Sequence, residues 1–325
     1  MKKIKNIPPA LVLWILAPTL GELLSSSSPP PEFFNPIIFF ILALLYGCGA
    51  VLIRELIFRW KKGWPSLLML GIAYGIYEEG IVVRSFFDPA WMDLGNLATY
   101  GRVFGVNWVW TEHLIHFHAL ISIAASITLV EIFYPEKRQR AWLNRRGWIL
   151  NALGFGVMLP LGRLLSEYRA PLPHLIFSWL AILGLVALAR LLPKRILDPR
   201  PAVQVPKPRR FWFLGFLGMT VYFFAVYLIS EKDFLPFPLT MFLLVIWDLL
   251  ILWLTLRWSG NGVAWDDRHR FALIAGGLST FILLSPITES QGQPGMIAVG
   301  IFTAMLLFLF NWKLRRRYEE NNEKV

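Results

Sequence analysis

The sequence predicts an all-α polytopic integral membrane protein, and three observations lead to that fold class. Of the 325 residues, 56% are hydrophobic and only 16% are charged, with a mean hydropathy of +0.54. A soluble domain carries roughly 25% charged residues. Apolar stretches of about 18–25 residues, the length that a helix needs to cross a bilayer, recur along the chain. The basic residues gather in the short segments between these stretches.

We predict about ten transmembrane helices, whose bounds follow the apolar stretches. They cover residues 9–25, 36–60, 65–87, 107–134, 147–166, 172–191, 211–230, 235–257, 270–288 and 295–313. The first span has a rival interpretation as a cleaved signal peptide, because a basic start precedes an apolar stretch and the small residues 25–28. Glu22 is unusual in such a peptide.

The lysines and arginines test this count. With the N-terminus in the cytoplasm, the cytoplasmic segments receive 26 basic residues and the outer loops receive four. Basic residues are enriched in cytoplasmic loops, so we expect both termini in the cytoplasm and a multi-pass protein of the cell (plasma) membrane. The same distribution assigns the net charge of +11 to membrane orientation rather than to nucleic-acid binding. The lipid bilayer is the expected partner, and the sequence leaves the oligomeric state open.

The predicted spans fall into two groups. Residues 1–192 form a six-helix membrane bundle, 193–210 a Pro- and Arg-rich cytoplasmic linker, 211–313 a four-helix bundle, and 314–325 a charged cytoplasmic tail that we expect to be disordered. Polar residues inside the spans concentrate in the first bundle, so we expect the functional site there. The single cysteine, Cys48, excludes an intrachain disulfide.

The third predicted span carries Glu78 and Glu79. A charged side chain at membrane depth is costly, so it needs a partner or a function. At 100° per residue, the two glutamates straddle a face formed by Gly71 and Gly75. Such a Gly-x-x-x-Gly face lets another helix pack closely. Arg84 lies on the opposite face of the same helix.

The fourth predicted span supplies imidazoles at the same predicted depth, in the outer half of the membrane. His118 shares a face with small residues, whereas Glu112, His113 and His116 share another side. We therefore expect His118 to meet the two glutamates. The remaining candidates for substrate contact or for support of the site are Arg84, Asn107, Glu112, His113, His116 and Glu22.

This combination favours hydrolysis as the first functional hypothesis. A carboxylate held away from bulk water is a candidate general base at neutral pH, and it would activate a water molecule. A neighbouring imidazole would donate a hydrogen bond to the oxyanion or protonate the leaving group.

The motifs around these residues resemble those of the CPBP (CAAX protease and bacteriocin-processing) membrane proteases. Residues 78–84 read Glu-Glu-Gly-Ile-Val-Val-Arg, one residue longer than the Glu-Glu-x-x-x-Arg of that family. Leu114 and His118 stand where the family has Phe-x-x-x-His, and His174 and Ser178 where it has His-x-x-x-Asn. The resemblance covers about residues 70–180. It implies an intramembrane hydrolase of a peptide or lipid-like substrate, with Glu78 or Glu79 as base and His118 as oxyanion partner. The extra residue in the first motif puts the role of Arg84 in doubt.

Three other hypotheses use the same residues. Intramembrane Glu and His also build proton- or ion-coupled transporters, in which Arg54, Glu55 and Asp248 would extend a path inward. Glu and His are ligands of Zn and Fe, so a metal site is another hypothesis, with the cofactor unknown and no residue assigned as a ligand. In the third hypothesis the chain is a structural membrane protein, and its buried Glu–His pairs only fix the register of the helices.

Overall fold

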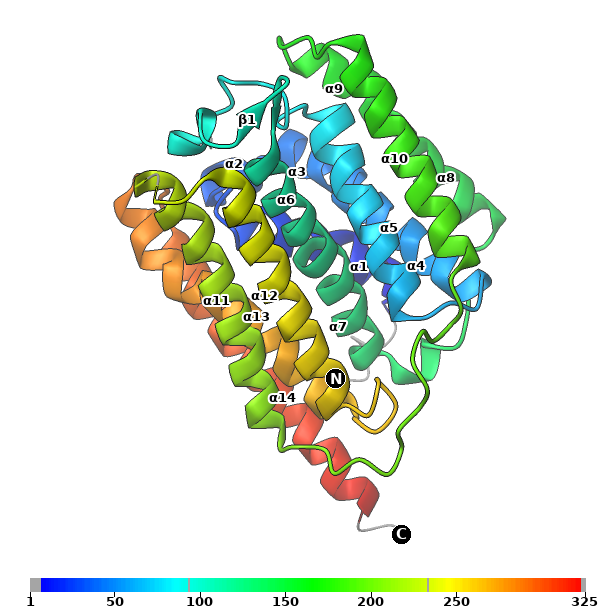
Figure 1. Cartoon of the computed structure of the whole chain (residues 1–325). Coiled ribbons are helices and arrows are strands. Elements are labelled where there is room, and N and C mark those ends of the chain that lie inside the picture. The colour runs from blue at the N-terminus through cyan, green and yellow to red at the C-terminus, as the bar shows by residue number, and fades with distance from the viewer. Residues whose placement is uncertain (1–6, 93, 233, 323–325) are drawn as a thin grey trace. The chain divides into compact units, whose positions relative to one another are not determined.

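The computed structural model describes residues 7–92, 94–232 and 234–322, and the described chain is mostly helical (Figure 1). Its short strands β1 (Arg102–Val103) and β2 (Val106–Asn107) form an antiparallel ribbon. Among the described residues, eight helices are long and apolar enough to cross a membrane. The predicted all-α membrane fold is therefore confirmed. These eight helices are Pro36–Arg59, Trp108–Phe133, Arg145–Leu165, Leu172–Leu191, Pro208–Glu231, Phe237–Trp258, Asp267–Ser290 and Met296–Glu320.

The first and third predicted spans differ from the others. The first corresponds to a shorter apolar helix, Pro9–Leu23. The third is helical over α5 (Trp64–Ile76) and the following π-helix η4 (Tyr77–Val82), but it is not among the eight. Its two glutamates reduce the hydropathy of the segment.

The described chain separates into two compact units. The first comprises Met1–Gly21, Pro36–Ile196 and Val226–Leu243, and the second comprises Glu22–Asn35, Leu197–Ala225 and Leu244–Val325, each taken over its described residues.

The first unit holds most of the N-terminal helices. A continuous helix consists of α6, η6 and α7, and it packs against α5. The elements are α1 (Pro9–Pro18), η2 (Thr19–Leu23, which continues into the second unit), α3 (Pro36–Leu42), η3 (Ala43–Gly47), α4 (Cys48–Arg59), α5, η4, η5 (Gly95–Ala98), β1, β2, α6 (Trp108–Phe117), η6 (His118–Ala125), α7 (Ser126–Phe133), η7 (Pro135–Lys137), α8 (Arg145–Gly156), α9 (Met158–Leu165) and α10 (Leu172–Leu191).

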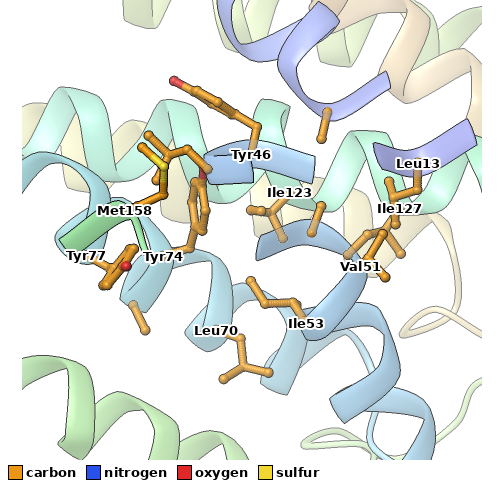
Figure 2. Close-up of a cluster of buried hydrophobic side chains, with 14 of the residues drawn as sticks. Leu13, Tyr46, Val51, Ile53, Leu70, Tyr74, Tyr77, Ile123, Ile127 and Met158 are labelled. Atoms are coloured by element: carbon orange, nitrogen blue, oxygen red, sulfur yellow. The ribbon is translucent and has the colours of Figure 1, made fainter. Parts of the chain in front are cut away.

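Figure 2 shows buried side chains of the core of this unit, contributed by several helices. Leu13 of α1, Val51 of α4 and Ile127 of α7 are each at most 3% exposed. Tyr46 of η3 and Tyr74 of α5 belong to this cluster, and their ring centroids are 6.0 Å apart. The core therefore brings α5, η3 and η6 together, and the candidate site lies on η6 and on η4, which continues α5.

The second unit contains the remaining helices, and two of its helices approach at glycines. A Cβ atom at Gly215 or Gly276 would collide with the backbone of the other helix, so only glycine permits this approach of α11 and α13. The elements are α2 (Pro30–Phe33), α11 (Pro208–Lys232) and α12 (Phe237–Trp258), which both also contribute to the first unit, α13 (Asp267–Ser290) and α14 (Met296–Asn322).

The tail corrects one expectation. Helix α14 continues to Asn322, so the predicted disorder from residue 314 is wrong as far as residue 322. Its residues 315–320 are rich in charges and lengthen the helix beyond its apolar part.

The connection between the third and fourth predicted spans is described over residues 88–92 and 94–106. Within it, Arg102 donates hydrogen bonds to the carbonyl oxygens of Phe87 (2.9 Å) and Ala98 (2.9 Å). Leu94 and Leu97 of the same connection are buried.

Candidate functional site

Two carboxylates and one imidazole meet inside the first unit. The Nε2 atom of His118 lies 3.1 Å from Oε1 of Glu79, and its Nδ1 atom lies 3.3 Å from Oε2 of Glu78. One potential ligand atom from each of the three residues lies within 4.8 Å of the other two. The three residues are between 2% and 8% exposed, so the cluster is enclosed by protein.

Glycine packing brings the two helices to this distance. A Cβ atom at Gly71 would lie 2.9 Å from Cα of Ala119, and one at Gly75 would lie 3.3 Å from Cβ of His118. The predicted glycine face of α5 therefore packs against the small-residue face of η6. The structure brings together the glutamates and the histidine that this packing predicted.

The glutamates and the histidine all lie in π-helical segments. Glu78 and Glu79 belong to η4, in which the amide of Val83 donates to the carbonyl of Glu78 (2.8 Å), and His118 begins η6. A π-helix is rare and holds one more residue in a turn than an α-helix, and such segments occur frequently at functional sites.

A chain of hydrogen bonds fixes the carboxylate of Glu79. Its Oε2 atom accepts a short hydrogen bond from the hydroxyl of Ser85. The indole nitrogen of Trp110 donates to that same hydroxyl oxygen over 3.0 Å. Because His118 contacts the other oxygen, both oxygens of Glu79 have polar contacts.

The imidazole is oriented by a hydroxyl and by aromatic rings. Nδ1 of His118 lies 3.2 Å from Oγ of Ser122, one helical turn further on. The ring centroids of Tyr46 and Tyr74 each lie 5.9 Å from that of the imidazole, and the centroid of Phe117 lies 5.4 Å away. Three aromatic rings therefore exclude water from much of the imidazole surface.

Arg84 does not join the cluster. It follows η4, it is 5% exposed, and its Nη1 atom donates to the carbonyl of Gly162 in α9 (3.3 Å). Its φ of 71° is in the left-handed region, which terminates the helix.

Asn107 is a helix cap. Its Oδ1 atom accepts from the amide of Trp110 (2.9 Å), and its amide group donates to the carbonyl of Leu97. The backbone amide of Asn107 also donates to the carbonyl of Phe86 (2.9 Å). Asn107 thus fixes the start of α6 against the segment that follows η4, and it supports the site from a distance.

The other predicted residues lie outside the cluster. His113 is buried with its ring centroid 5.8 Å from that of Trp110 and 5.5 Å from that of Tyr227. Glu112 and His116 are half-buried on the same helix. Glu22 accepts a hydrogen bond from Ser28 (2.8 Å) within the second unit. Among the described residues, one group of three His, Cys, Asp or Glu side chains has its ligand atoms within 4.8 Å of one another. That group is Glu78, Glu79 and His118, so it contains none of these four residues.

His174 and Ser178, the residues of the last CPBP-like motif, make their contacts elsewhere in the first unit. His174 Nε2 lies 2.8 Å from the carbonyl oxygen of Phe104 and so contacts the folded connection. Ser178 faces η4, since a Cβ atom at Gly80 would lie 3.2 Å from its Oγ atom.

The sequence alone does not identify Tyr46, Tyr74, Ser85 and Trp110 as parts of the site. Ser85 follows the end of a helix, where helical angles no longer predict direction. The aromatic residues carry no signal that separates them from the other aromatics of an apolar helix.

The charges of the cluster limit what it can do. The imidazole carries at most one positive charge, so the two carboxylates together keep a negative charge unless a proton or a cation joins them. A buried charge is stable only if it is paired and hydrogen-bonded. The cluster is therefore suited to hold a proton, a cation or a polarised water molecule.

Comparison with protein families now places the chain. Residues 11–259 match a family described as an uncharacterized membrane protein family, and the chain belongs to it. No curated protein and no solved structure matches the chain. The match is not to the CPBP proteases, so the resemblance to them stays a prediction.

Proposed function

We propose that this member of an uncharacterized membrane protein family is an intramembrane hydrolase whose site is Glu78, Glu79 and His118. The observation that carries the proposal is the contact of one imidazole with two buried carboxylates, at 3.1 Å and 3.3 Å. In the proposed topology both termini are in the cytoplasm of a plasma-membrane protein, and the site lies in the outer half of the membrane.

The proposed reaction is the hydrolysis of a carbonyl compound, a peptide or a lipid-like ester. One carboxylate removes a proton from water, whose oxygen attacks the carbonyl carbon. His118 donates a hydrogen bond to the developing oxyanion. It then gives its own proton to the leaving nitrogen or oxygen as the bond from that atom to carbon breaks, and the proton that the carboxylate took from water replaces it on the imidazole. The other carboxylate holds the imidazole in place. General acid–base catalysis of this kind contributes typically 10²–10⁴-fold to the rate.

The π-helix η4 accommodates the extra residue of the CPBP-like motif. The motif of this chain is one residue longer than the family pattern between its glutamates and its arginine. A π-helical turn accommodates one additional residue. The extra residue therefore fits the observed winding of Tyr77–Val82.

Two of the three residues expected to continue a transport path, Arg54 and Glu55, make structural contacts. Arg54 donates to the carbonyl oxygens of Arg138 (2.7 Å) and Arg140 (2.7 Å), and Glu55 accepts from the amide of Trp142 (2.7 Å). These side chains anchor the segment after α7. A residue committed to such contacts is a poor relay for protons or ions, so we favour hydrolysis.

A labelling experiment tests hydrolysis even while the substrate is unidentified. The full chain, reconstituted in liposomes, is incubated with a pool of membrane peptides and a lipid extract in water enriched in heavy oxygen. Mass spectrometry then detects heavy oxygen in newly formed carboxyl groups. We expect labelled products with the wild type and a loss of at least about 100-fold with Glu78→Gln or Glu79→Gln.

The control is Glu167→Gln, which changes an exposed glutamate of the same unit and should leave the rate unchanged. Size-exclusion chromatography and thermal unfolding check that each variant is folded. The proposal is wrong if the wild type produces no labelled product or if both glutamine variants keep the full rate. A proton flux across the same liposomes that both variants abolish would support transport instead.

A further inference from the structure

We infer that Glu78, Glu79 and His118 bind one divalent first-row transition-metal ion, of the kind represented by Zn²⁺ and Mn²⁺. A role of the ion in hydrolysis rests on the proposed function. The binding of the ion rests on the cluster geometry alone.

The spacing of the ligand atoms fits one ion. Two ligand atoms that each lie about 2.0–2.1 Å from a tetrahedral Zn²⁺ are roughly 3.4 Å apart. Nε2 of His118 and Oε1 of Glu79 are 3.1 Å apart, and a ligand atom of Glu78 lies within 4.8 Å of both residues. Oε2 of Glu78 lies 3.3 Å from Nδ1 of His118 rather than from Nε2, so the Glu78 side chain must turn toward Nε2 when the ion binds. Three protein ligands leave a fourth position for water, as in catalytic zinc sites.

The charge of the cluster also fits a divalent cation. Two carboxylates and a neutral imidazole carry two negative charges, and one divalent ion neutralises both. A proton on the imidazole neutralises only one of them. At 2% and 8% exposure, the two glutamates are largely shielded from water, and a buried charge needs a paired and hydrogen-bonded counter-charge. An imidazole among the ligands favours transition metals over Mg²⁺ and Ca²⁺, which prefer oxygen.

The residues behind the ligands are arranged as supports of a metal site. A metal-bound histidine almost always donates from its other ring nitrogen, which fixes the tautomer. Nδ1 of His118 lies 3.2 Å from Oγ of Ser122 and 3.3 Å from Oε2 of Glu78, so Nε2, which faces Glu79, is the nitrogen offered to the ion. Ser85 donates to Glu79, and Trp110 donates to Ser85. The carboxylate is thereby held in one orientation.

The experiment measures metal bound to the purified full chain. The protein is stripped with a chelator, restored with Zn²⁺ alone or Mn²⁺ alone, and analysed for metal per chain by mass spectrometry of the elements. We expect about one ion per chain in the wild type and in Glu167→Gln. Glu79→Gln and His118→Ala should bind at least tenfold more weakly. Ser85→Ala should weaken binding by roughly tenfold, since removal of such a supporting residue typically costs 10–100-fold.

X-ray absorption of the wild type keeps the test valid if a ligand variant fails to fold. We expect one imidazole with oxygen ligands and no sulfur. A wild type that binds neither Zn²⁺ nor Mn²⁺ above background overturns the inference. So does a spectrum with sulfur or with two or more imidazoles, which would indicate Cys48 or the pair His113 and His116.

Failure of this inference and failure of the proposed function are distinguishable. Hydrolysis by fully stripped protein would overturn a role of the ion in the reaction and leave the glutamate-based hydrolase. A wild type that hydrolyses the substrate pool but binds neither Zn²⁺ nor Mn²⁺ would overturn the metal site itself. Stoichiometric metal lost in Glu79→Gln, without any labelled hydrolysis product, would support the metal site and overturn the hydrolase.

Discussion

The packing of α5 against η6 should make Gly71 intolerant of even one added methyl group. A Cβ atom there would lie 2.9 Å from Cα of Ala119 and 3.2 Å from its Cβ and carbonyl oxygen. These are backbone atoms and a short side chain, so they cannot rotate away. Overpacking of this kind typically costs about 1–3 kcal/mol. Alanine also gains up to about 1 kcal/mol over glycine in a helix interior, which would hide part of the cost.

A matched control removes that gain from the comparison. Gly184 lies inside α10 of the same unit, and a Cβ atom there would meet no atom within 4 Å. We expect Gly71→Ala to have a free energy of unfolding about 1–3 kcal/mol lower than Gly184→Ala. Denaturation of both variants in mixed micelles measures the difference. Equal stabilities, within about 0.5 kcal/mol, would refute the close approach of the two helices.

Three further predictions concern other parts of the chain. Arg54→Met should lower the free energy of unfolding by about 3 kcal/mol, because it leaves the fully buried Glu55 without its closest cation at 2.9 Å. Chemical denaturation that shows a loss of no more than about 1 kcal/mol would contradict this prediction. Asp266→Ala should cost about 0.5–2 kcal/mol at pH 7, because Asp266 caps α13. Burial opposes ionisation of Asp266, but hydrogen bonds from the side chains of His269 and Arg268 hold its pKa below the usual range. The contribution of ionised Asp266 to stability is therefore present above about pH 4 and is lost as the pH falls below that value. The difference in free energy of unfolding between the wild type and Asp266→Ala should thus be smaller at pH 3 than at pH 7. In Gly75→Ala the new Cβ atom would meet Cβ of His118 at 3.3 Å and displace the imidazole. This variant should therefore lose more of the heavy-oxygen product than of its stability. An equal loss of both would argue against displacement of the imidazole.

The central pairing could be predicted because it depends on features that the sequence displays directly. Gly71 and Gly75 mark one face of an apolar helix, and the small residues beside His118 mark another. Membrane helices pack at such faces. Two intramembrane glutamates need a partner, and the histidine on the small-residue face of the next span is the nearest candidate.

Other features depend on geometry that the sequence does not display. The predicted angles of Glu78 and Glu79 assume 100° per residue, whereas η4 winds as a π-helix. Ser85 reaches Glu79 only because the chain turns at Arg84, whose φ is positive. The continuation of α14 through its charged end, to Asn322, could not be predicted because charge is typical of both solvated helices and disordered tails.

A double-mutant cycle between Glu79 and His118 tests most directly that these two side chains interact in one enclosed cluster. The free energy of unfolding is measured for the wild type, Glu79→Gln, His118→Ala and the double variant. Residues in direct contact show interaction energies of about 0.5–3 kcal/mol, and a buried pair at 3.1 Å should lie in the upper half of that range. Effects that add within about 0.3 kcal/mol would mean that the two side chains do not interact, and the proposed site would fall with that result.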